Sequence, residues 1–316
     1  RTHKPEVSGS IPLPATISFL NKNKKMLSKI TVVMVLYNVS EKIFECLDNI
    51  KSVKIIIINN GKTEKNIINR IKQYKNLVKF INSKKNLGYG RAANFALKLV
   101  KTKYSLMLGA DVLVTEDNIL ELINKAIFYD DAGIIVPTVL NENNIHDDYL
   151  ENLPEFESGI KRNFHEEESN NKLSKKFIEG DTCINISWGA IWLLNNKIIK
   201  KIGFMDKNIF LYWEDFEVCR RLRFSKIPMI KVITAKATHH RSTGTRQNYL
   251  NYFIQQKYHI LSSYYYFKVD KKSFQLKRKF FLYLFRSITY LLILNFKKSL
   301  KNVARMCAIY SFVFKR

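Results

Sequence analysis

Two adjacent acids, Glu214 and Asp215, follow a run of apolar and aromatic residues that begins after Asn208. Burying one carboxylate among apolar groups is costly, and burying two is worse because their charges also repel each other. Such a pair is therefore typical of a catalytic site. These residues alone leave a second interpretation open, since acids are also favoured in the first turn of a helix, at the positive end of its dipole.

Polar side chains also follow four apolar runs that predict buried strands. The predicted strands cover residues 30–37, 53–58, 77–82 and 104–108. The polar residues beyond their ends are Asn38, the pair Asn59-Asn60, Asn86 and Asp111. Because ligands of parallel sheets bind beyond the carboxyl ends of the strands, we expect these side chains to share one crevice.

Segments with a helical pattern separate these strands, and further elements follow them. The predicted helices cover residues 40–50, 63–76, 117–129, 195–202 and 216–224, and a glycine-containing loop at 86–94 opens another that ends at Lys101. Further strands are predicted over residues 133–136, 184–194 and 229–233, with a polar loop or lid at 141–180. This alternation predicts an α/β fold with a mixed, mostly parallel sheet flanked by helices.

The chain carries a large excess of positive charge, with 53 Lys plus Arg against 27 Asp plus Glu and a net charge of +26. An excess of this size indicates an anionic partner, such as nucleic acid, an anionic membrane surface or a phosphorylated substrate. The four cysteines are widely scattered, which argues against a zinc site and against a disulfide framework.

Both ends of the chain differ from its middle. Residues 1–25 contain no methionine and no long apolar run, so we expect a disordered extension there. A catalytic domain is predicted over residues 26–247. Residues 248–316 are predicted to form a C-terminal helical region rich in basic and aromatic side chains.

Within this C-terminal region, residues 280–296 form a largely apolar stretch that is broken by Arg286 and flanked by basic clusters. A helix that spans a membrane needs about 20 apolar residues, so the stretch is marginal as a span. Its composition favours a helix that lies on the surface of an anionic membrane. An ordinary helical hairpin that packs on a core is the alternative.

The order of these motifs resembles the family 2 glycosyltransferases of GT-A fold, a Rossmann-like architecture, and in particular their rhamnosyltransferase- and galactofuranosyltransferase-like branch. The resemblance covers residues 30–245. Its most specific part is Gly203-Phe-Met-Asp206 followed by Phe210-Leu-Tyr-Trp-Glu-Asp215 and then His239. It implies transfer of a sugar from a nucleoside-diphosphate donor to a hydroxyl group of a glycan acceptor.

The resemblance also implies roles for individual residues. Asp215 matches the general base, and the residues expected to bind the acceptor are Trp188, Gly189, Trp213 and Glu214. The residues expected to bind the donor are Leu36, Tyr37, Asn38, Asn59, Asn86, Arg91, Asn94 and Asp111. Asp111 and His239 would share a Mg²⁺ or Mn²⁺ ion that bridges the donor phosphates. Asn59 stands where the family usually has Asp, and Gly109 replaces the first Asp of its Asp-x-Asp motif.

The expected protein is thus a metal-dependent, inverting glycosyltransferase of surface polysaccharide or lipopolysaccharide biosynthesis. It would be cytoplasmic and peripheral on the inner face of the cell membrane, with a nucleotide sugar, a glycan or polyprenyl-linked acceptor and an anionic membrane surface as partners. Two alternatives stay open. One is a basic nucleic-acid-binding protein, although no nucleic-acid motif is present, and the other is a catalytically inactive glycosyltransferase-like scaffold.

Overall fold

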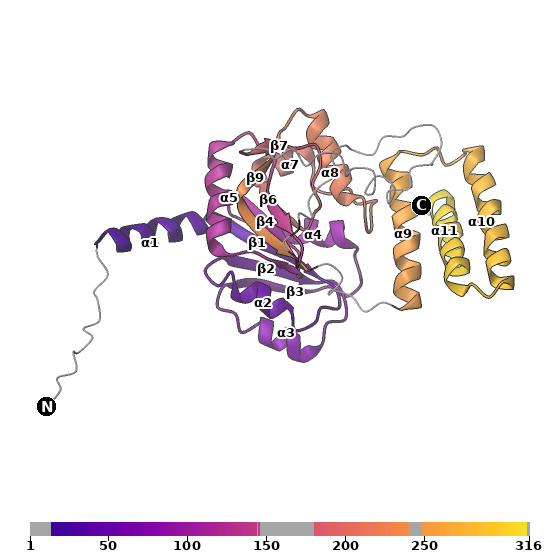
Figure 1. Cartoon of the computed structure of the whole chain (residues 1–316), viewed down its shortest axis with the longest axis horizontal. Helices are drawn as coiled ribbons and strands as arrows, with labels where there is room; N and C mark the ends of the chain where they lie inside the picture. Colours follow the sequence, from indigo (N-terminus) through magenta and orange to yellow (C-terminus); the bar gives the residue numbers. More distant parts are fainter. Residues whose placement is uncertain (1–13, 144, 146–179, 241–247, 315–316) are drawn as a thin grey trace.

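The structure of the chain is a computed structural model that describes residues 14–143, 145, 180–240 and 248–314. Its centre is a mixed sheet with nine strands in the described residues, ordered β3-β2-β1-β4-β8-β6-β9-β5, with β7 paired to β9 (Figure 1). The strands are β1 (Ile30–Leu36), β2 (Lys54–Asn59), β3 (Leu77–Asn82), β4 (Tyr104–Leu108), β5 (Val112–Leu113), β6 (Ile134–Leu140), β7 (Thr182–Cys183), β8 (Ile191–Asn195) and β9 (Met229–His239).

Parallel pairing joins β3, β2, β1 and β4 in one half of the sheet. In the other half, β8 runs antiparallel to both β4 and β6, while β6 and β9 are parallel. The predicted α/β fold with a mixed, mostly parallel sheet is therefore confirmed.

Helices cover both faces of the sheet. Those before the C-terminal region are α1 (Pro14–Leu27), α2 (Ile43–Asp48), α3 (Lys65–Ile71), α4 (Tyr89–Leu97), α5 (Glu116–Phe128), α7 (Asn196–Ile202) and α8 (Glu214–Phe224). Alternate residues of the central strands serve the two faces: Ile55 and Ile57 pack with α2, α3 and α5, while Ile56 and Ile58 pack with α4, α7 and α8. This alternation explains why these strands are apolar at every position.

The C-terminal region consists of α9 (Tyr249–Tyr266), α10 (Phe274–Leu292) and α11 (Phe296–Phe314). Helix α9 lies between the sheet and the α10–α11 hairpin (Figure 1). Its Tyr266 belongs to the hydrophobic cluster on the α8 side of the sheet, whereas Tyr264 packs with Leu276 and Phe312 in a separate small core. The region beyond residue 247 is thus continuous with the core of the sheet domain.

The apolar stretch 280–296 does not form a single helix. Helix α10 ends at Leu292 and α11 begins at Phe296, so the stretch crosses the turn of a hairpin. The two helices meet at small residues, with the Ser287 and Ser299 hydroxyl oxygens 3.0 Å apart. Among the described helices, none combines the length and apolar character that crossing a membrane requires.

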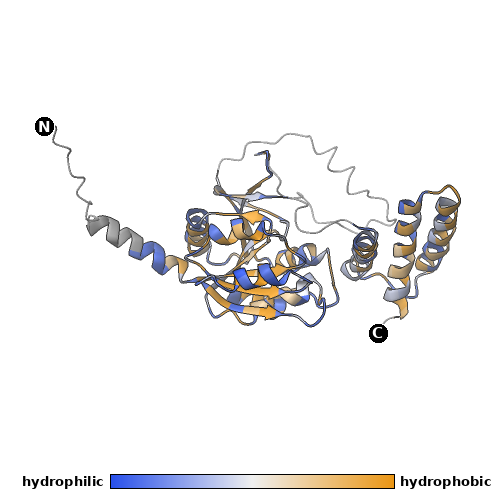
Figure 2. Cartoon of the chain, turned by 90° about the horizontal axis from the view of Figure 1, so that it is seen from below, coloured by the Kyte–Doolittle hydropathy of each residue, from blue (hydrophilic) through white to orange (hydrophobic). Residues whose placement is uncertain are grey.

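The hairpin leaves much of its apolar surface uncovered. Leu276, Tyr283 and Ser287 of α10 face its partners, whereas Phe281, Phe285, Ile288 and Leu292 lie on the opposite face and are exposed. Figure 2 shows hydrophobic residues along this hairpin as well as in the strands of the sheet. A contiguous exposed apolar patch of this kind marks an interaction surface.

Several predicted boundaries were wrong. Residues 14–25 were expected to be disordered, but they lie in α1, which contacts α5. The helix begins with Pro14 and has Lys24 and Lys25 in its last turn, where positive charge interacts favourably with the helix dipole. The strand predicted over 184–194 is reduced to β8, because the residues before Ile191 run along a cavity instead. Strand β9 continues beyond Ile233 to His239, since pairing with β6 and β5 extends it. The expected loop at 141–180 lies almost entirely outside the described residues.

Candidate active site

A cavity of about 520 Å³ lies beyond the carboxyl end of β4. It brings together residues from six separate stretches of the chain. The lining residues are Tyr89, Gly109, Asp111, Trp188, Gly189, Ala190, Trp192, Met205, Glu214, Asp215 and His239. Six of the residues singled out from the sequence, namely Asp111, Trp188, Gly189, Glu214, Asp215 and His239, therefore share one cavity.

The side chains of Asp111 and His239 lie next to each other in the cavity wall. Strand β5 pairs with the end of β9 so that Val112 lies opposite His239, and the His240 amide donates to the Asp111 carbonyl oxygen at 2.9 Å. This pairing places Asp111 Oδ2 3.6 Å from His239 Nε2. Gly109 lies beside them, and a Cβ there would lie 2.9 Å from Asp111 Oδ1, so a larger residue would displace the Asp111 carboxylate.

The two adjacent acids occupy the first turn of α8. Tyr212 and Trp213 have left-handed backbone conformations, with φ of 64° and 69°, and this bend turns Glu214 and Asp215 toward the cavity. Asp215 Oδ1 accepts a hydrogen bond from the Phe216 amide at 2.9 Å. The interpretation as acids in the first turn of a helix is thus correct, and both acids also line the cavity.

Burial controls the protonation of both acids. Desolvation raises the pKa of Asp215 above its usual range, although backbone N–H groups of Phe216 and Gly189 oppose this change. The pKa of Glu214 is raised further, first by desolvation and then by the charge of Asp215 beside it. The pair therefore keeps a proton at a higher pH than two exposed acids would, and the backbone N–H groups that contact Asp215 favour the negative charge on that acid.

Trp213 does not line the cavity, contrary to the expected acceptor-binding role. Its side chain is 4% exposed, packs against Phe216 and Tyr266, and donates from Nε1 to the His259 carbonyl oxygen at 3.0 Å. An indole this large gains most free energy by complete burial, and here α9 supplies the cover. Trp213 anchors the bend that carries the acids.

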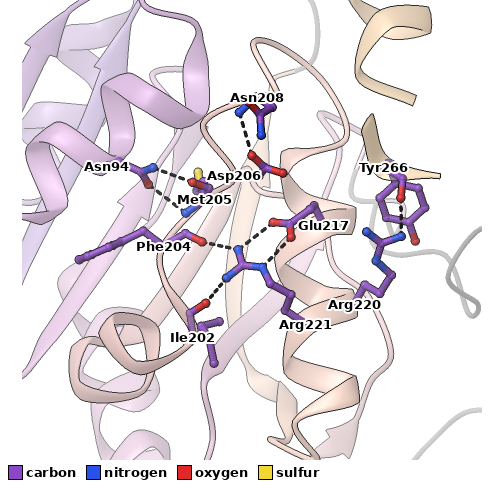
Figure 3. Close-up of polar contacts among 10 residues, drawn as sticks. All are labelled: Asn94, Ile202, Phe204, Met205, Asp206, Asn208, Glu217, Arg220, Arg221 and Tyr266. Carbon is purple, nitrogen blue, oxygen red and sulfur yellow. Dashed lines mark hydrogen bonds and ion pairs between the residues drawn. The ribbon is translucent and has the colours of Figure 1, made fainter. Parts of the chain in front are cut away.

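The segment before this bend is held by polar contacts shown in Figure 3. Arg221 of α8 forms an ion pair with Glu217 at 2.6 Å and donates to the carbonyl oxygens of Ile202 and Phe204. On the other side, Asn94 of α4 exchanges two hydrogen bonds with the backbone of Met205, at 2.7 and 3.0 Å. Asn94 therefore positions the Gly203–Asp206 segment and is not placed to bind a donor directly.

Two polar atoms in the cavity wall are buried without a hydrogen-bond partner among the described residues. They are Nε1 of Trp192, whose side chain is 1% exposed, and Oε2 of Glu214. A buried N–H group that stays unpaired is costly, and such atoms in a cavity are typical sites for hydrogen bonds to a ligand. Trp192 was not singled out from the sequence, because it lies within an apolar strand.

A second cavity of about 210 Å³ adjoins the first, and Tyr89 lines both. Its lining residues are Val35, Tyr37, Asn60, Asn86, Gly88, Tyr89, Phe210, Leu211, Tyr212, Asn251, Ile254 and Gln255. Tyr37 and Asn86 are the two expected donor-binding residues found here. The single crevice expected beyond the strand ends is therefore two cavities with a shared wall.

The remaining expected donor-binding residues line neither cavity. Leu36 is fully buried in the core. The Asn38 side chain accepts from the Lys62 amide at 2.6 Å, and Asn59 is buried between Asn82 and Thr63. Arg91 donates to the Lys207 carbonyl oxygen at 2.6 Å. Short polar side chains at strand ends often stabilise the adjacent turn in this way, and spacing alone does not distinguish the two roles.

Asn60, rather than its neighbour Asn59, reaches the second cavity. Its amide bonds Asn86 Oδ1 at 3.0 Å and the Gly88 carbonyl oxygen, and its Oδ1 accepts from the Leu87 amide at 2.8 Å. Gly88 has a φ of +81°, and a Cβ there would lie 2.2 Å from the Phe210 carbonyl oxygen. The alternation of side chains along an extended strand end could have indicated that only one of the two asparagines faces the cavity.

Asp111 and His239 are the side chains suited to hold a divalent cation. A carboxylate oxygen and an imidazole nitrogen, at the observed separation and open to the cavity, fit Mg²⁺ or Mn²⁺. Within the described residues no group of three or more His, Cys, Asp or Glu side chains could hold a metal ion. An ion bound here would take its remaining ligands from substrate or water.

We predict that Glu214→Gln stabilises the folded chain by an amount that grows with pH. The folded state keeps a proton on Glu214 after the unfolded state has lost it, so the stability of the wild type falls as pH rises above the usual glutamate range. Glutamine does not titrate, so the stability of the variant has no such pH dependence. The stability difference between variant and wild type grows by about 1.4 kcal/mol for each pH unit between the unfolded-state and folded-state pKa values of Glu214.

Urea unfolding of both chains at about pH 5 and about pH 8 would measure this difference. Glu45→Gln, at an exposed position of α2, is the control and should show no such trend. A stability difference for Glu214→Gln that is the same at both pH values would contradict the prediction.

Solved structures show where else this architecture occurs. The chain is similar to GalNAc-T7 with UDP, GalNAc and Mn²⁺, at 12% identity and a TM-score of 0.55, over 91% of this chain and 56% of that one. It is also similar to the mannosyltransferase PcManGT of Pyrobaculum calidifontis in complex with GDP-Man and Mn²⁺, at 13% identity and a TM-score of 0.52, over 93% and 82% of the two chains. The chain thus spans little more than half the length of the GalNAc-T7 chain. These likenesses confirm the predicted GT-A fold.

The sequence matches point the same way. The chain is 22% identical over 197 residues to rhamnosyltransferase WbbL of Escherichia coli strain K12, which covers 57% of this chain and 69% of that protein. This relative comes from the branch that the motifs indicated. The profile of the family described as glycosyl transferase family 2 matches residues 31–203, more than half of the 316 residues. The chain belongs to glycosyl transferase family 2.

Proposed function

We propose that the chain is an inverting glycosyltransferase that moves a hexosyl or deoxyhexosyl group from a nucleoside-diphosphate sugar to a hydroxyl group of a glycan. The observation that carries the proposal is the cavity that the Asp215 carboxylate shares with the Asp111–His239 pair. One cavity would thus supply both a base for the acceptor and a site for the charged leaving group. Family membership supports the reaction class.

Asp215 acts as the general base in this proposal. It takes the proton of the acceptor hydroxyl while that oxygen forms a bond to the anomeric carbon of the donor, and the bond to the diphosphate breaks with its electron pair leaving on the phosphate oxygen. A single carboxylate base, with attack from the face opposite the leaving group, inverts the anomeric centre. The raised pKa of Asp215 brings its proton affinity closer to the working pH than that of an ordinary aspartate.

Glu214 and the two tryptophans that line the cavity suit the acceptor. The protonated Glu214 can donate a hydrogen bond to a sugar oxygen, and the Trp192 N–H group is free to do the same. Trp188 is 37% exposed and stands edge-on to Phe216, which leaves its ring open to a sugar face. Rigid aromatic rings and hydrogen-bond donors of this kind can hold the acceptor sugar with its hydroxyl group near the Asp215 carboxylate.

Asp111 and His239 would hold Mg²⁺ or Mn²⁺. A divalent cation at this position supplies positive charge that stabilises the leaving diphosphate. The complexes of GalNAc-T7 and PcManGT contain Mn²⁺ together with UDP or GDP-Man, which supports the same cofactor and donor class here.

The C-terminal hairpin would place the enzyme on the inner face of the cell membrane. The exposed apolar face of α10 lies next to exposed basic residues, among them Arg286, Lys297 and Lys298. An apolar face bordered by cations is the pattern of a helix that lies in the surface of an anionic leaflet. Such a position would give access to a polyprenyl-linked acceptor, and the likeness to WbbL supports a role in surface polysaccharide or lipopolysaccharide assembly.

Asp215→Asn should lower sugar transfer by about 10²- to 10⁴-fold while donor binding stays within about threefold, because the amide keeps the shape of the carboxylate but cannot take a proton. Release of nucleoside diphosphate from UDP-, GDP- and dTDP-sugars, with a membrane lipid extract as the acceptor source, measures transfer, and calorimetry measures binding. Asp117→Asn, at an exposed position of α5, is the control. Full turnover by Asp215→Asn would exclude it as the base.

His239→Gln should raise the Mn²⁺ concentration needed for half-maximal activity by about tenfold or more, because one of two protein ligands is lost. His240→Gln is a matched control, since His240 is adjacent in sequence but contacts Glu142 and does not line the cavity. Activity that EDTA leaves unchanged in the wild type would refute metal dependence altogether.

The double variant Phe285→Glu, Leu292→Glu should reduce binding to phosphatidylglycerol vesicles by at least about tenfold, because two exposed apolar side chains that would enter the bilayer become charged. Co-sedimentation with phosphatidylglycerol and phosphatidylcholine vesicles gives the measurement. Val78→Glu, at an exposed apolar position of β3, is the control. Equal sedimentation of wild type and double variant would show that the hairpin does not dock.

A further inference from the structure

Helix α9 forms one wall of the smaller cavity, although it lies outside residues 31–203 that match the family. Its contribution comes from Asn251, Ile254 and Gln255, which the helical repeat of about 3.6 residues places on one face. The opposite wall is formed by the ends of β1 and β2 and by the loop before α4. The cavity is therefore incomplete without the C-terminal region.

The position of α9 is determined by close contacts on the same face. The Tyr258 ring stacks on Phe210 with centroids 4.1 Å apart, and the Ser262 hydroxyl donates to the Leu211 carbonyl oxygen at 2.8 Å. Next to Tyr258 in the helix, the His259 carbonyl oxygen accepts from Trp213 Nε1 at 3.0 Å. Three successive contacts along the 210–213 segment hold α9 in register with the cavity wall, so its polar side chains have defined positions.

The chemistry of this cavity differs from that of its neighbour. Acids and a histidine line the larger cavity, whereas every residue that lines the smaller one is uncharged. Its walls combine the rings of Tyr37, Tyr89 and Phe210 with side-chain amides. No cation lines it to hold a phosphate, and at about 210 Å³ it is smaller than the roughly 300–1,000 Å³ of a drug-sized site. The walls suit one neutral, planar ring with hydrogen-bonding edges, which is the chemistry of a nucleobase.

Gln255 is the side chain best placed to read such a ring. The amide of Asn60 is already engaged with Asn86 and the Gly88 carbonyl oxygen. In contrast, the Gln255 amide makes no side-chain hydrogen bond with any of the described residues. Its N–H groups and its carbonyl oxygen both remain available, and together they can satisfy an adjacent donor and acceptor on the edge of a base.

We infer that α9 completes the donor site and that Gln255 is a specificity-determining residue that recognises the nucleobase. This inference rests on the proposed function, because it assumes that the two adjoining cavities hold one nucleoside-diphosphate sugar. The base occupies the uncharged cavity, and the diphosphate lies toward Asp111. The helical region that carries the exposed hairpin is then part of the substrate-binding unit.

Calorimetric titration of the full chain, with Mn²⁺ present, tests this inference. The probes are UDP, dTDP, GDP, CDP and ADP, together with inorganic pyrophosphate. Gln255→Ala should weaken binding of the preferred nucleotide by about 3- to 10-fold, as expected for one or two neutral hydrogen bonds. The ratio of the dissociation constants of the other nucleotides to that of the preferred one should become smaller. Pyrophosphate binding should not change. Gln255→Glu, which keeps the size of the side chain but removes its N–H donors, should alter the base preference as well.

Gln256→Ala is the matched control, because the same residue type follows at the next position of the helix without lining the cavity. Equal effects of the two alanine substitutions would overturn the role of Gln255 and leave the proposed function intact. The affinity that Gln255→Ala loses is also compared between UDP and UDP-glucose. If this loss depends on the attached sugar and not on the base, the assignment of the smaller cavity to the base is overturned. If the wild type binds none of the nucleotides, the proposed function and the inference both fail.

Discussion

The bend at Tyr212 and Trp213 is the constraint on which the geometry of the site depends. Two consecutive side chains with Cβ atoms adopt a left-handed backbone, which costs about 1–2 kcal/mol for each residue. The bend persists because Trp213 is buried under α9 and bonded to it. Without the burial and the hydrogen bond of Trp213, nothing would offset the cost of the bend, and α8 would not begin at Glu214 with both acids in the cavity.

The same anchor joins the chemistry to the C-terminal region. Helix α9 supplies cover for Trp213, a wall for the smaller cavity and the attachment for the α10–α11 hairpin. The C-terminal region is therefore a structural part of the site and not an appended tail.

Charge is distributed unevenly between the two cavities, and Tyr89 stands at the boundary. Burial raises the pKa of the Tyr89 phenol, so it stays neutral between an acidic cavity and an uncharged one. Gly88 beside it allows the loop before α4 to approach Phe210 at backbone distance. The division suits the proposed donor. Its neutral base would lie against uncharged walls, and the cation held by Asp111 and His239 would offset the repulsion between its diphosphate and the acids of the larger cavity.

The sequence alone determined the family, six residues of the larger cavity, and the strands and helices apart from α1, β5 and β7. These follow from local patterns: buried strands are apolar at every position, and strand ends of a parallel sheet converge on one edge. It also predicted the C-terminal helices and their basic, apolar character.

The sequence could not show that the Asn59 side chain is hydrogen-bonded to Asn82 and Thr63 while Asn60 lines the smaller cavity. It also could not show that Trp213 is buried under α9 and does not line the larger cavity. Those outcomes depend on which partners the tertiary structure brings near a side chain. For the same reason, only the structure placed Trp192 and Gln255 at the cavities. In an apolar strand or a tyrosine-rich helix, the sequence pattern does not distinguish a residue that lines a cavity from one that packs against other side chains.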